Sequence, residues 1–538
     1  MMTPTRRDFL KSAIAIPALA YVQDPKPAAN GDTAFADFES GTFDGWTLSG
    51  NCWTKEPHTT TTIPGITGFQ GKRFLCTLHP KLGTSATGKA VSREFTIEKP
   101  FINFLIGGGH YPGEACLNLV VDGKVVRSET GNDSAEFSRV CWDVYELTGK
   151  TAHLELVDNS KSDQRGYVML DDIHLSDRPM TDLQHNLDKI GQEAFQKLGT
   201  PCLGIAIVQD GSIVAITTLG VNDLRNPESL FTTNSIIRVG SVSKPICGYV
   251  IAQVVSNHKL NWDTKLRDVC PDICAGTAHL SVNATLANFV SHTSGVKYRR
   301  YQPSAASNDV ALSGVKWREM TIREDLLRSE ANGQPGEKTE YSGGMDFAAV
   351  MAERATGETF ESLLSTILTA PNGLNTVRLG VSSVSDLHPM SVGQIFDKSS
   401  GRFVREGFLY GGGKSLPKYR AETTGAIAGS FLEIAKASFV CSGLSAKDHQ
   451  NGVFRALRTL PLPRLSNTTL GGWGLINGGL AHNGSYGFEL AHAQVDDKTR
   501  SLVLFYTNGI YEAENGQSEQ PDFGKYISRV FRLIGPVR

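Results

Sequence analysis

A serine and a lysine stand three residues apart in the segment IIRVGSVSKPICGYVIAQVV, residues 236–255. They are Ser241 and Lys244. Residues three apart on a helix share a face, so the two side chains can meet. A neutral lysine amine can take the proton of a serine hydroxyl, and the serine oxygen can then attack a carbonyl carbon. The alternative interpretation of the same spacing is a helix-capping serine followed by a solvated lysine.

The same spacing also occurs in four other places, which begin at Ser256, Ser294, Ser313 and Ser415. Only Ser241 combines a preceding β-like run, residues 235–239, with a glycine hinge and a following apolar helical stripe. This context predicts a serine at a helix N-terminus, where the helix dipole favours a developing oxyanion. Burial of the first turn would also favour a neutral lysine amine.

Two downstream segments contain further polar residues suited to acyl transfer. They are PGEKTEYSGGMDFAAVMAERATG, residues 335–357, and LAHNGSYGFELA, residues 480–491. With RVGSVSKP and NFVSHTSGV they resemble the motifs of the serine β-lactamase superfamily, in the branch of class C β-lactamases, D-alanyl-D-alanine peptidases and esterases. The resemblance covers about residues 183–535. The Gly-x-Ser-x-Gly pattern of α/β-hydrolases does not occur.

The resemblance implies a role for each matching residue. Ser241 would be the nucleophile and Lys244 its base or proton relay. Tyr341 would shuttle protons to the leaving group, with the nearby lysine favouring its phenolate form. Read without the resemblance, Tyr341 is an ordinary core tyrosine.

The third motif supplies the remaining site residues. His482 would hydrogen-bond a substrate carboxylate or carbonyl, or tune the tyrosine; otherwise it is a satisfied strand histidine. The backbone N–H groups of Ser241 and Ser485 would form an oxyanion hole, and Gly484 would let substrate lie close to the strand. The superfamily's Tyr-x-Asn motif ends here in Gly343, which favours esterase-like chemistry over β-lactam hydrolysis.

Residues 32–177 alternate apolar and polar residues between Gly, Asn and Asp turns, which predicts an antiparallel β-sandwich. The segments DFESGTFDGW and VMLDDIHL resemble a galactose-binding-like jelly-roll module of secreted glycoside hydrolases. That resemblance implies association with carbohydrate, and the alternative is a spacer domain without a ligand. Glu39 and Asp172 could share a structural calcium, although a turn-capping or solvated carboxylate is the favoured interpretation of each.

The N-terminal segment TRRDFLKSAIAIPALA resembles a twin-arginine export signal that ends at a small-residue cleavage site, Ala18–Ala20. Residues 1–20 would be the signal and 21–31 a linker, which implies a periplasmic or extracellular protein exported in folded form. No later stretch has the roughly 18 uninterrupted apolar residues of a membrane span. The net charge of −2 gives no basic field for nucleic acid. No catalytic metal motif or cofactor motif is found.

The sequence therefore predicts a multidomain chain. A β-sandwich occupies residues 32–177, and an α/β β-lactamase-like domain, which includes a helical subdomain, occupies residues 178–538. The predicted function is an exported serine hydrolase that cleaves a small ester, amide or peptide through an acyl-enzyme on Ser241. One alternative is D-alanyl-D-alanine carboxypeptidase, penicillin-binding or β-lactamase activity. Another is a catalytically silent protein that binds cell wall or glycan.

Overall fold

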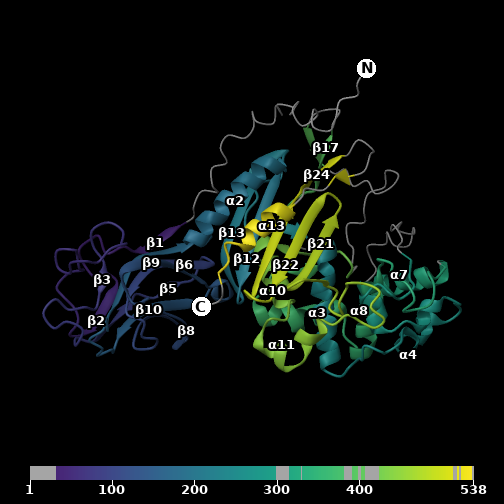
Figure 1. Cartoon of the computed structure of the whole chain (residues 1–538), viewed down its shortest axis with the longest axis horizontal. Coiled ribbons are helices and arrows are strands. Elements are labelled where there is room, and N and C mark those ends of the chain that lie inside the picture. The colour runs from purple at the N-terminus through teal and green to yellow at the C-terminus, as the bar shows by residue number, and fades with distance from the viewer. Residues whose placement is uncertain are drawn as a thin grey trace, which may run out of the picture. The chain divides into compact units, whose positions relative to one another are not determined.

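The structure is a computed structural model that describes residues 32–297, 314–328, 330–380, 390–397, 402–405, 423–512, 518–519 and 523–535 (Figure 1). The predicted signal and linker, and the serines at 313 and 415, lie outside the described residues. The chain divides into two compact units. One comprises Asn30–Asp188 with Ser212–Ile216, and the other includes Lys189–Gly211 and Thr217–Arg538.

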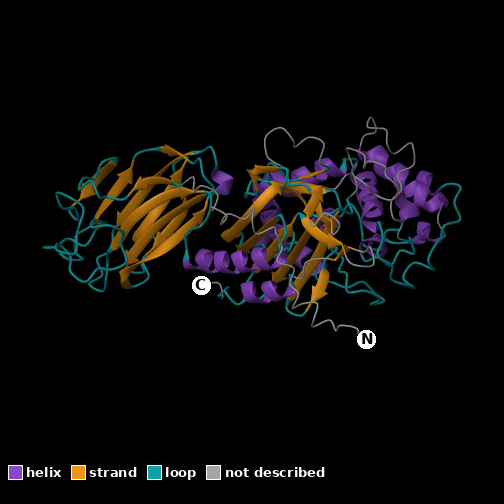
Figure 2. Ribbon diagram, turned by 90° about the horizontal axis from the view of Figure 1, so that it is seen from above, coloured by secondary structure: helices purple, strands orange, loops and turns teal. Residues whose placement is uncertain are grey.

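The N-terminal unit is built from antiparallel strands, as predicted. Its strands are β1 Thr33–Ala36, β2 Trp46–Gly50, β3 Leu75–Cys76, β4 Gly88–Ser92, β5 Phe95–Thr96, β6 Phe101–Gly108, β7 Ala115–Val121, β8 Lys124–Thr130, β9 Ser134–Asp143, β10 Thr151–Asp158 and β11 Val168–Ser176. One sheet has the order β1-β11-β6-β9 with β3 beside β11, and the other has the order β2-β4-β10-β7-β8 with β5 beside β10. Both sheets are visible in Figure 2.

One apolar core fills the space between these sheets. Phe104 and Leu170 from the first sheet and Leu117 and Leu154 from the second are fully buried in the same cluster. The alternating pattern that predicted the strands thus places one face of each sheet in a shared core. The turn between β7 and β8, at Asp122–Gly123, has positive φ at both residues, as a tight turn between twisted strands requires.

The second unit has a seven-stranded sheet with the order β14-β13-β12-β23-β22-β21-β20. These strands are β12 Cys202–Gln209, β13 Ser212–Asp223, β14 Asn226–Leu230, β20 Gly474–Ile476, β21 Gly479–Tyr486, β22 Glu489–Asp496 and β23 Ser501–Thr507. Every residue of β23 is buried, as is almost every residue of β12, because these two strands lie at the centre of the sheet. Smaller sheets are formed by β15 Ile236–Arg238, β19 Ile427–Ser430 and β16 Arg378–Leu379, and by β18 Arg402–Arg405, β17 Gln394–Asp397, β24 Gly509–Glu512 and β25 Ser518–Glu519.

Helices lie on both faces of the seven-stranded sheet (Figure 2). The longer α-helices are α2 Asp182–Leu198, α3 Ser243–Ser256, α7 Gly314–Arg328, α8 Gly344–Thr356, α10 Phe431–Val440 and α13 Gly524–Phe531. The shorter ones are α4 Leu266–Val269, α5 Pro271–Cys274, α6 Leu286–Val290, α9 Phe360–Leu364, α11 Ala446–Gln450 and α12 Val453–Ala456. Helix α3 is apolar on nearly all sides and is buried over most of its length, which marks it as a central helix.

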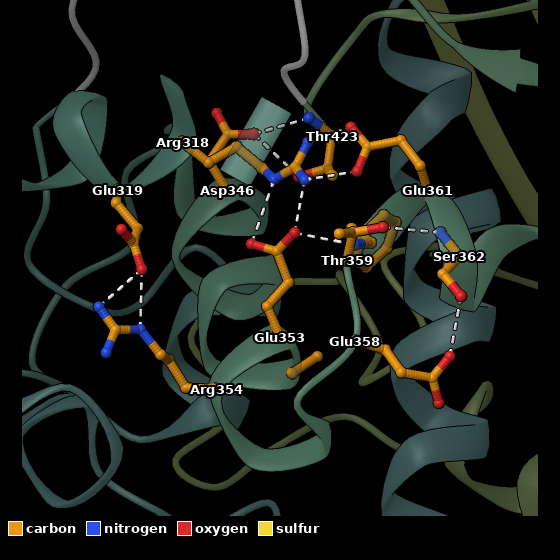
Figure 3. Close-up of polar contacts among 12 residues, drawn as sticks. Arg318, Glu319, Asp346, Glu353, Arg354, Glu358, Thr359, Glu361, Ser362 and Thr423 are labelled. Carbon is orange, nitrogen blue, oxygen red and sulfur yellow. Dashed lines mark hydrogen bonds and ion pairs between the residues drawn. The ribbon is translucent and has the colours of Figure 1, made fainter. Parts of the chain in front are cut away.

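A buried arginine joins three of these helices. The Arg318 side chain on α7 is completely buried and pairs with Glu353 on α8 at 2.5 Å and with Glu361 on α9 at 2.8 Å (Figure 3). The two carboxylates raise the pKa of the guanidinium, so it stays charged. The network fixes the position of α8, which begins three residues after Tyr341.

The break between the compact units falls within α2, between Asp188 and Lys189, whereas the sequence placed a domain boundary near residue 178. Within the described part of the chain, no helix combines the length and the apolar character needed to cross a membrane.

Candidate active site

Ser241 lies where a strand turns into a buried helix. β15 is followed by a single 3-10 turn, η3 Gly240–Val242, and then directly by α3. Ser241 is the middle residue of η3, and Gly240 has a φ of +52°, which favours glycine at this sharp turn. The predicted context, a strand, a glycine hinge and a helix start, is therefore confirmed.

Lys244 is held against Ser241. Its Nζ donates a hydrogen bond to the Ser241 Oγ at 3.0 Å and another to the backbone carbonyl of Thr424 at 2.9 Å. Only 1% of Lys244 is exposed, so the amine is shielded from bulk water. The alternative of a solvated lysine after a capping serine is wrong, because the side chain points inward.

Tyr341 lies over the same amine. The Lys244 Nζ is 4.5 Å from the centre of the Tyr341 ring, and 45% of the tyrosine is exposed. Burial raises the pKa of Tyr341, and a hydrogen bond with Ser241 lowers it by less. The expectation that the lysine would favour phenolate is therefore wrong: desolvation outweighs the other contributions, so the hydroxyl stays protonated at neutral pH.

His292 packs against the ring of the tyrosine. The ring centres of His292 and Tyr341 are 4.5 Å apart, and His292 Nδ1 accepts a hydrogen bond from the Ser342 N–H at 3.3 Å. Burial, together with the charge of Lys244, lowers the pKa of His292 to about 3, so the imidazole is neutral. The segment NFVSHTSGV contributed to the family resemblance, but the sequence assigned this histidine no function.

β21 passes unusually close to the η3 turn that carries Ser241. A Cβ added at Gly484 would lie 1.9 Å from the Val239 carbonyl oxygen and 3.1 Å from the Ser241 nitrogen. A Cβ added at Gly240 would lie 2.5 Å from the Ser485 nitrogen. The missing side chain at Gly484 therefore leaves room for the turn that carries Ser241. The prediction was that it leaves room for substrate. The same approach places the backbone nitrogens of Ser241 and Ser485 near one another.

His482 lies in β21, within the strand rather than at its start. Its Nδ1 is 2.6 Å from the Asn483 carbonyl oxygen, which can only accept, so Nδ1 carries the proton and Nε2 is an acceptor. Burial, followed by the charge of Lys244, lowers the pKa of His482 to about 3. The predicted hydrogen bond from His482 to a substrate carboxylate conflicts with this tautomer, because a carboxylate also only accepts.

A buried carboxylate close to the site was not predicted. Asp346, in the first turn of α8, accepts hydrogen bonds from the Thr423 N–H at 2.7 Å and its hydroxyl at 2.8 Å (Figure 3). It also accepts one from the Thr424 hydroxyl at 3.0 Å. The sequence signal that could have indicated this carboxylate is an aspartate at an apolar position of a helix. Gly343 contributes no side chain here, and its backbone has an ordinary φ of −74°.

The predicted calcium pair is not assembled in the N-terminal unit. Asp172 is bound by Arg139 at 2.5 Å and His174 at 2.8 Å, whereas Glu39 accepts from the backbone N–H groups of Lys72 and Arg73. The pKa of another carboxyl, Asp171, is raised to about 7. Burial is the main cause, and the charge of Glu39 adds to it. Among the described residues, no three His, Cys, Asp or Glu side chains form a group that could hold a metal ion.

Two further features of the chain are a cavity and its cysteines. A cavity of about 460 Å³ is lined by residues that include Gln253, Asn257 and Lys447, toward the other end of α3, so it is separate from this chemistry. All nine cysteines are free thiols.

Three known proteins illustrate the similarities of this chain. It is 35% identical over 158 residues to "Putative glycosyl hydrolase ecdE" of Aspergillus rugulosus, which covers 28% of this chain and 22% of that protein. It is 23% identical over 201 residues to Esterase EstB of Burkholderia gladioli, which covers 36% of this chain and 50% of the esterase. The chain thus spans half or less of these curated relatives.

Among solved structures, the octameric penicillin-binding protein homologue from Pyrococcus abyssi has a TM-score of 0.50 at 18% identity. The alignment covers 66% of this chain and 78% of that one, and it shows a shared fold. The family model named Beta-lactamase matches residues 187–518, more than half of the chain and the whole stretch from β12 to β25. The chain therefore belongs to the beta-lactamase family, and the Ser241 site lies within its family domain.

Proposed function

We propose that this protein is a serine hydrolase that cleaves an ester or amide bond through an acyl-enzyme on Ser241. The observation that carries the proposal is the 3.0 Å hydrogen bond between the buried Lys244 amine and the Ser241 hydroxyl. A catalytically silent protein has no need to bury a lysine against a half-buried serine, because desolvating an amine is costly unless it is used or fully paired.

The reaction follows from the positions of these groups. In the reactive form Lys244 is a neutral amine, which takes the Ser241 hydroxyl proton as the oxygen attacks the substrate carbonyl carbon. The N–H groups of Ser241 and Ser485 would bind the oxyanion that forms. Tyr341, a neutral phenol within hydrogen-bonding reach of Ser241, would give its proton to the leaving group and recover one from Lys244. Water then hydrolyses the acyl-serine ester by the same steps in reverse.

The substrate that fits best is an ester without a carboxylate next to the scissile bond. A carboxypeptidase needs a cation or hydrogen-bond donor for the terminal carboxylate, and His482 is neutral with an acceptor nitrogen. The similarity to an esterase supports this choice. D-alanyl-D-alanine carboxypeptidase, penicillin-binding or β-lactamase activity is the second candidate, supported by the motifs shared with that branch.

We also propose that the chain is exported by the twin-arginine route and that its N-terminal unit associates with carbohydrate. The RR-x-FLK segment and the similarity to a protein named as a glycosyl hydrolase support these two proposals. Replacing Arg6 and Arg7 by lysine should leave folded precursor in the cytoplasm, and continued export would refute the first. Full-length protein should be retained on insoluble polysaccharide, and absence of retention on a panel of glycans would refute the second.

The catalytic proposal is tested with three ligands. A fluorophosphonate probe reports an active serine, a short-chain p-nitrophenyl ester reports esterase turnover, and labelled penicillin reports the second candidate. Wild-type protein should react with the first two, and Ser241→Ala with none. Rapid labelling by penicillin with no ester turnover would favour the second candidate. No Ser241-dependent reaction with any ligand would favour a silent protein.

A further inference from the structure

The buried carboxylate of Asp346 has no part in the reaction as written, although it lies close to it. Asp346 is 7% exposed, and its two oxygens receive three hydrogen bonds from two consecutive threonines. An aspartate in this setting is costly to bury, and the three donors offset part of that cost.

The second of these threonines contacts the catalytic lysine directly. The Thr424 carbonyl accepts a hydrogen bond from the Lys244 Nζ at 2.9 Å, while the same nitrogen donates to the Ser241 Oγ at 3.0 Å. A lysine side chain has four rotatable bonds, so two fixed acceptors define the amine position far better than one. The amine is thus held between the serine and a carbonyl whose own position depends on Asp346.

The neighbouring residue offers no substitute for this acceptor. Gly343 has no side chain, and a Cβ built there would have only the Asp346 Oδ2, at 3.8 Å, within 4 Å. Position 343 therefore leaves open space beside Asp346 and gives Lys244 no acceptor of its own. The Thr424 carbonyl is therefore an acceptor that orients the amine together with the Ser241 hydroxyl.

We propose that Asp346 is a positioning residue, which holds Thr423 and Thr424 so that the Thr424 carbonyl aims the Lys244 amine at Ser241. The inference rests on the proposed serine hydrolase function and adds to it a device built from α8. When Lys244 takes the serine proton, the O–H bond breaks and an N–H bond forms. The resulting ammonium still donates to the Thr424 carbonyl, so the same contact serves both protonation states.

The test compares Asp346→Ala with the isosteric Asp346→Asn in the full chain. The asparagine oxygen can still accept from both donors of Thr423, and its amide can donate to the Thr424 hydroxyl. We expect Asp346→Ala to slow single-turnover acylation by a p-nitrophenyl ester by about tenfold to a hundredfold, with little change in KM, because the amine is misplaced. Asp346→Asn should keep most of the wild-type rate. Rates are taken per active site titrated by slow, complete labelling.

A matched control is present elsewhere in the same unit. Glu433 is fully buried, and its Oε2 accepts from the N–H of Thr376 at 2.7 Å and from its hydroxyl at 2.6 Å. Glu433→Ala removes a similar carboxylate–threonine contact that does not lead to Lys244. It should lower thermal stability and leave the acylation rate per active site unchanged.

A double variant tests whether Asp346 and Thr424 act on Lys244 together. If Asp346 acts through Thr424, then Asp346→Ala combined with Thr424→Val should be no slower than Asp346→Ala alone. Three results would overturn the inference: an unchanged rate in Asp346→Ala, an equal loss in Asp346→Asn, or additive losses in the double variant. If Asp346→Ala does not fold, the acylation rates of Asp346→Asn and Thr424→Val still test the inference. Thr424→Val should lose only a few-fold in rate. Failure of the proposed function would give a different result from failure of this inference, because wild-type acylation would then not depend on Ser241.

Discussion

At the scale of single residues, the Ser241 site is defined by burial more than by residue type. Five Ser-x-x-Lys pairs occur in the sequence, and the pair at Ser241 has its lysine almost entirely buried and bonded to the serine. The strand, glycine and helix context was enough to select this pair from sequence. The protonation states were not predictable from the sequence. Burial raises the pKa of Tyr341 against the expected influence of the lysine, and burial together with the charge of Lys244 lowers the pKa of His482.

The neutral phenol makes a specific prediction for Tyr341→Phe. If the hydroxyl protonates the leaving group, its loss should slow hydrolysis of an alkyl ester by about a hundredfold. A p-nitrophenyl ester, whose leaving group departs without a proton, should be affected much less. Steady-state kcat/KM for the two esters measures the difference. Tyr249→Phe removes a buried hydroxyl bonded to Asp448 and serves as the control, with an unchanged ratio. An equal loss on both esters would assign Tyr341 another role.

The histidine beside the site should not set the pH dependence. The pKa of His482 is about 3, so its imidazole stays neutral as pH falls from 8 to 5. Activity lost over that range must come from protonation of another group, and Lys244 must be neutral to accept the serine proton. We expect His482→Gln to lower kcat/KM while leaving the midpoint of its acid limb unchanged. A pH–rate profile that loses or moves this limb in the variant would show that His482 titrates there.

At the scale of elements, the proposed oxyanion hole would depend on the close crossing of β21 and the η3 turn. Gly240 and Gly484 face each other across this crossing, and neither position has room for a Cβ. The sequence identified Gly484 through its motif, but it could not reveal that the backbone of another segment, more than two hundred residues earlier, fills the space.

This crossing predicts a double cost for Gly484→Ala. The added methyl group would meet the Val239 carbonyl, which should destabilise the fold by about 1–3 kcal/mol and displace β21 from Ser241. Gly479→Ala, on the same strand, meets the Val495 carbonyl at the same 1.9 Å but away from the nucleophile. Thermal melts should show losses in both variants, and ester turnover per folded molecule should fall only in Gly484→Ala. Equal turnover in the two variants would contradict the importance of this crossing.

The elements themselves were largely predictable where hydrophobic periodicity is strong. The strands of the N-terminal unit, the helix at 182–198, the hairpin around Asp210–Gly211 and the final amphipathic helix all form. The small sheets of β15, β19 and β16 and of β17, β18, β24 and β25 were not predicted in full. Their strands are short and pair across long stretches of sequence, so their periodicity is too brief to recognise.

At the scale of the whole molecule, the site is assembled from distant parts of one unit. Ser241 lies in η3, Lys244 lies in the first turn of α3, Tyr341 precedes α8, Thr424 precedes β19, and His482 and Ser485 lie on β21. The family domain, residues 187–518, contains all of them, and the N-terminal sheets lie outside it. The order of motifs along the chain was therefore predictable, whereas the contribution of Asp346 and Thr424 depends on three-dimensional contacts that no motif records.

The most direct test of the account is the site of covalent labelling by a fluorophosphonate probe, located by mass spectrometry of peptides from wild type and Ser241→Ala. The account predicts one adduct on Ser241 in the wild type and none in the variant. The variant should remain folded, because the substitution removes one partly buried hydroxyl and its hydrogen bond with Lys244, about 0.5–1.5 kcal/mol. Ser256→Ala, at another Ser-x-x-Lys pair, should label like the wild type. An adduct on any other serine, or full labelling of Ser241→Ala, would contradict the central claim.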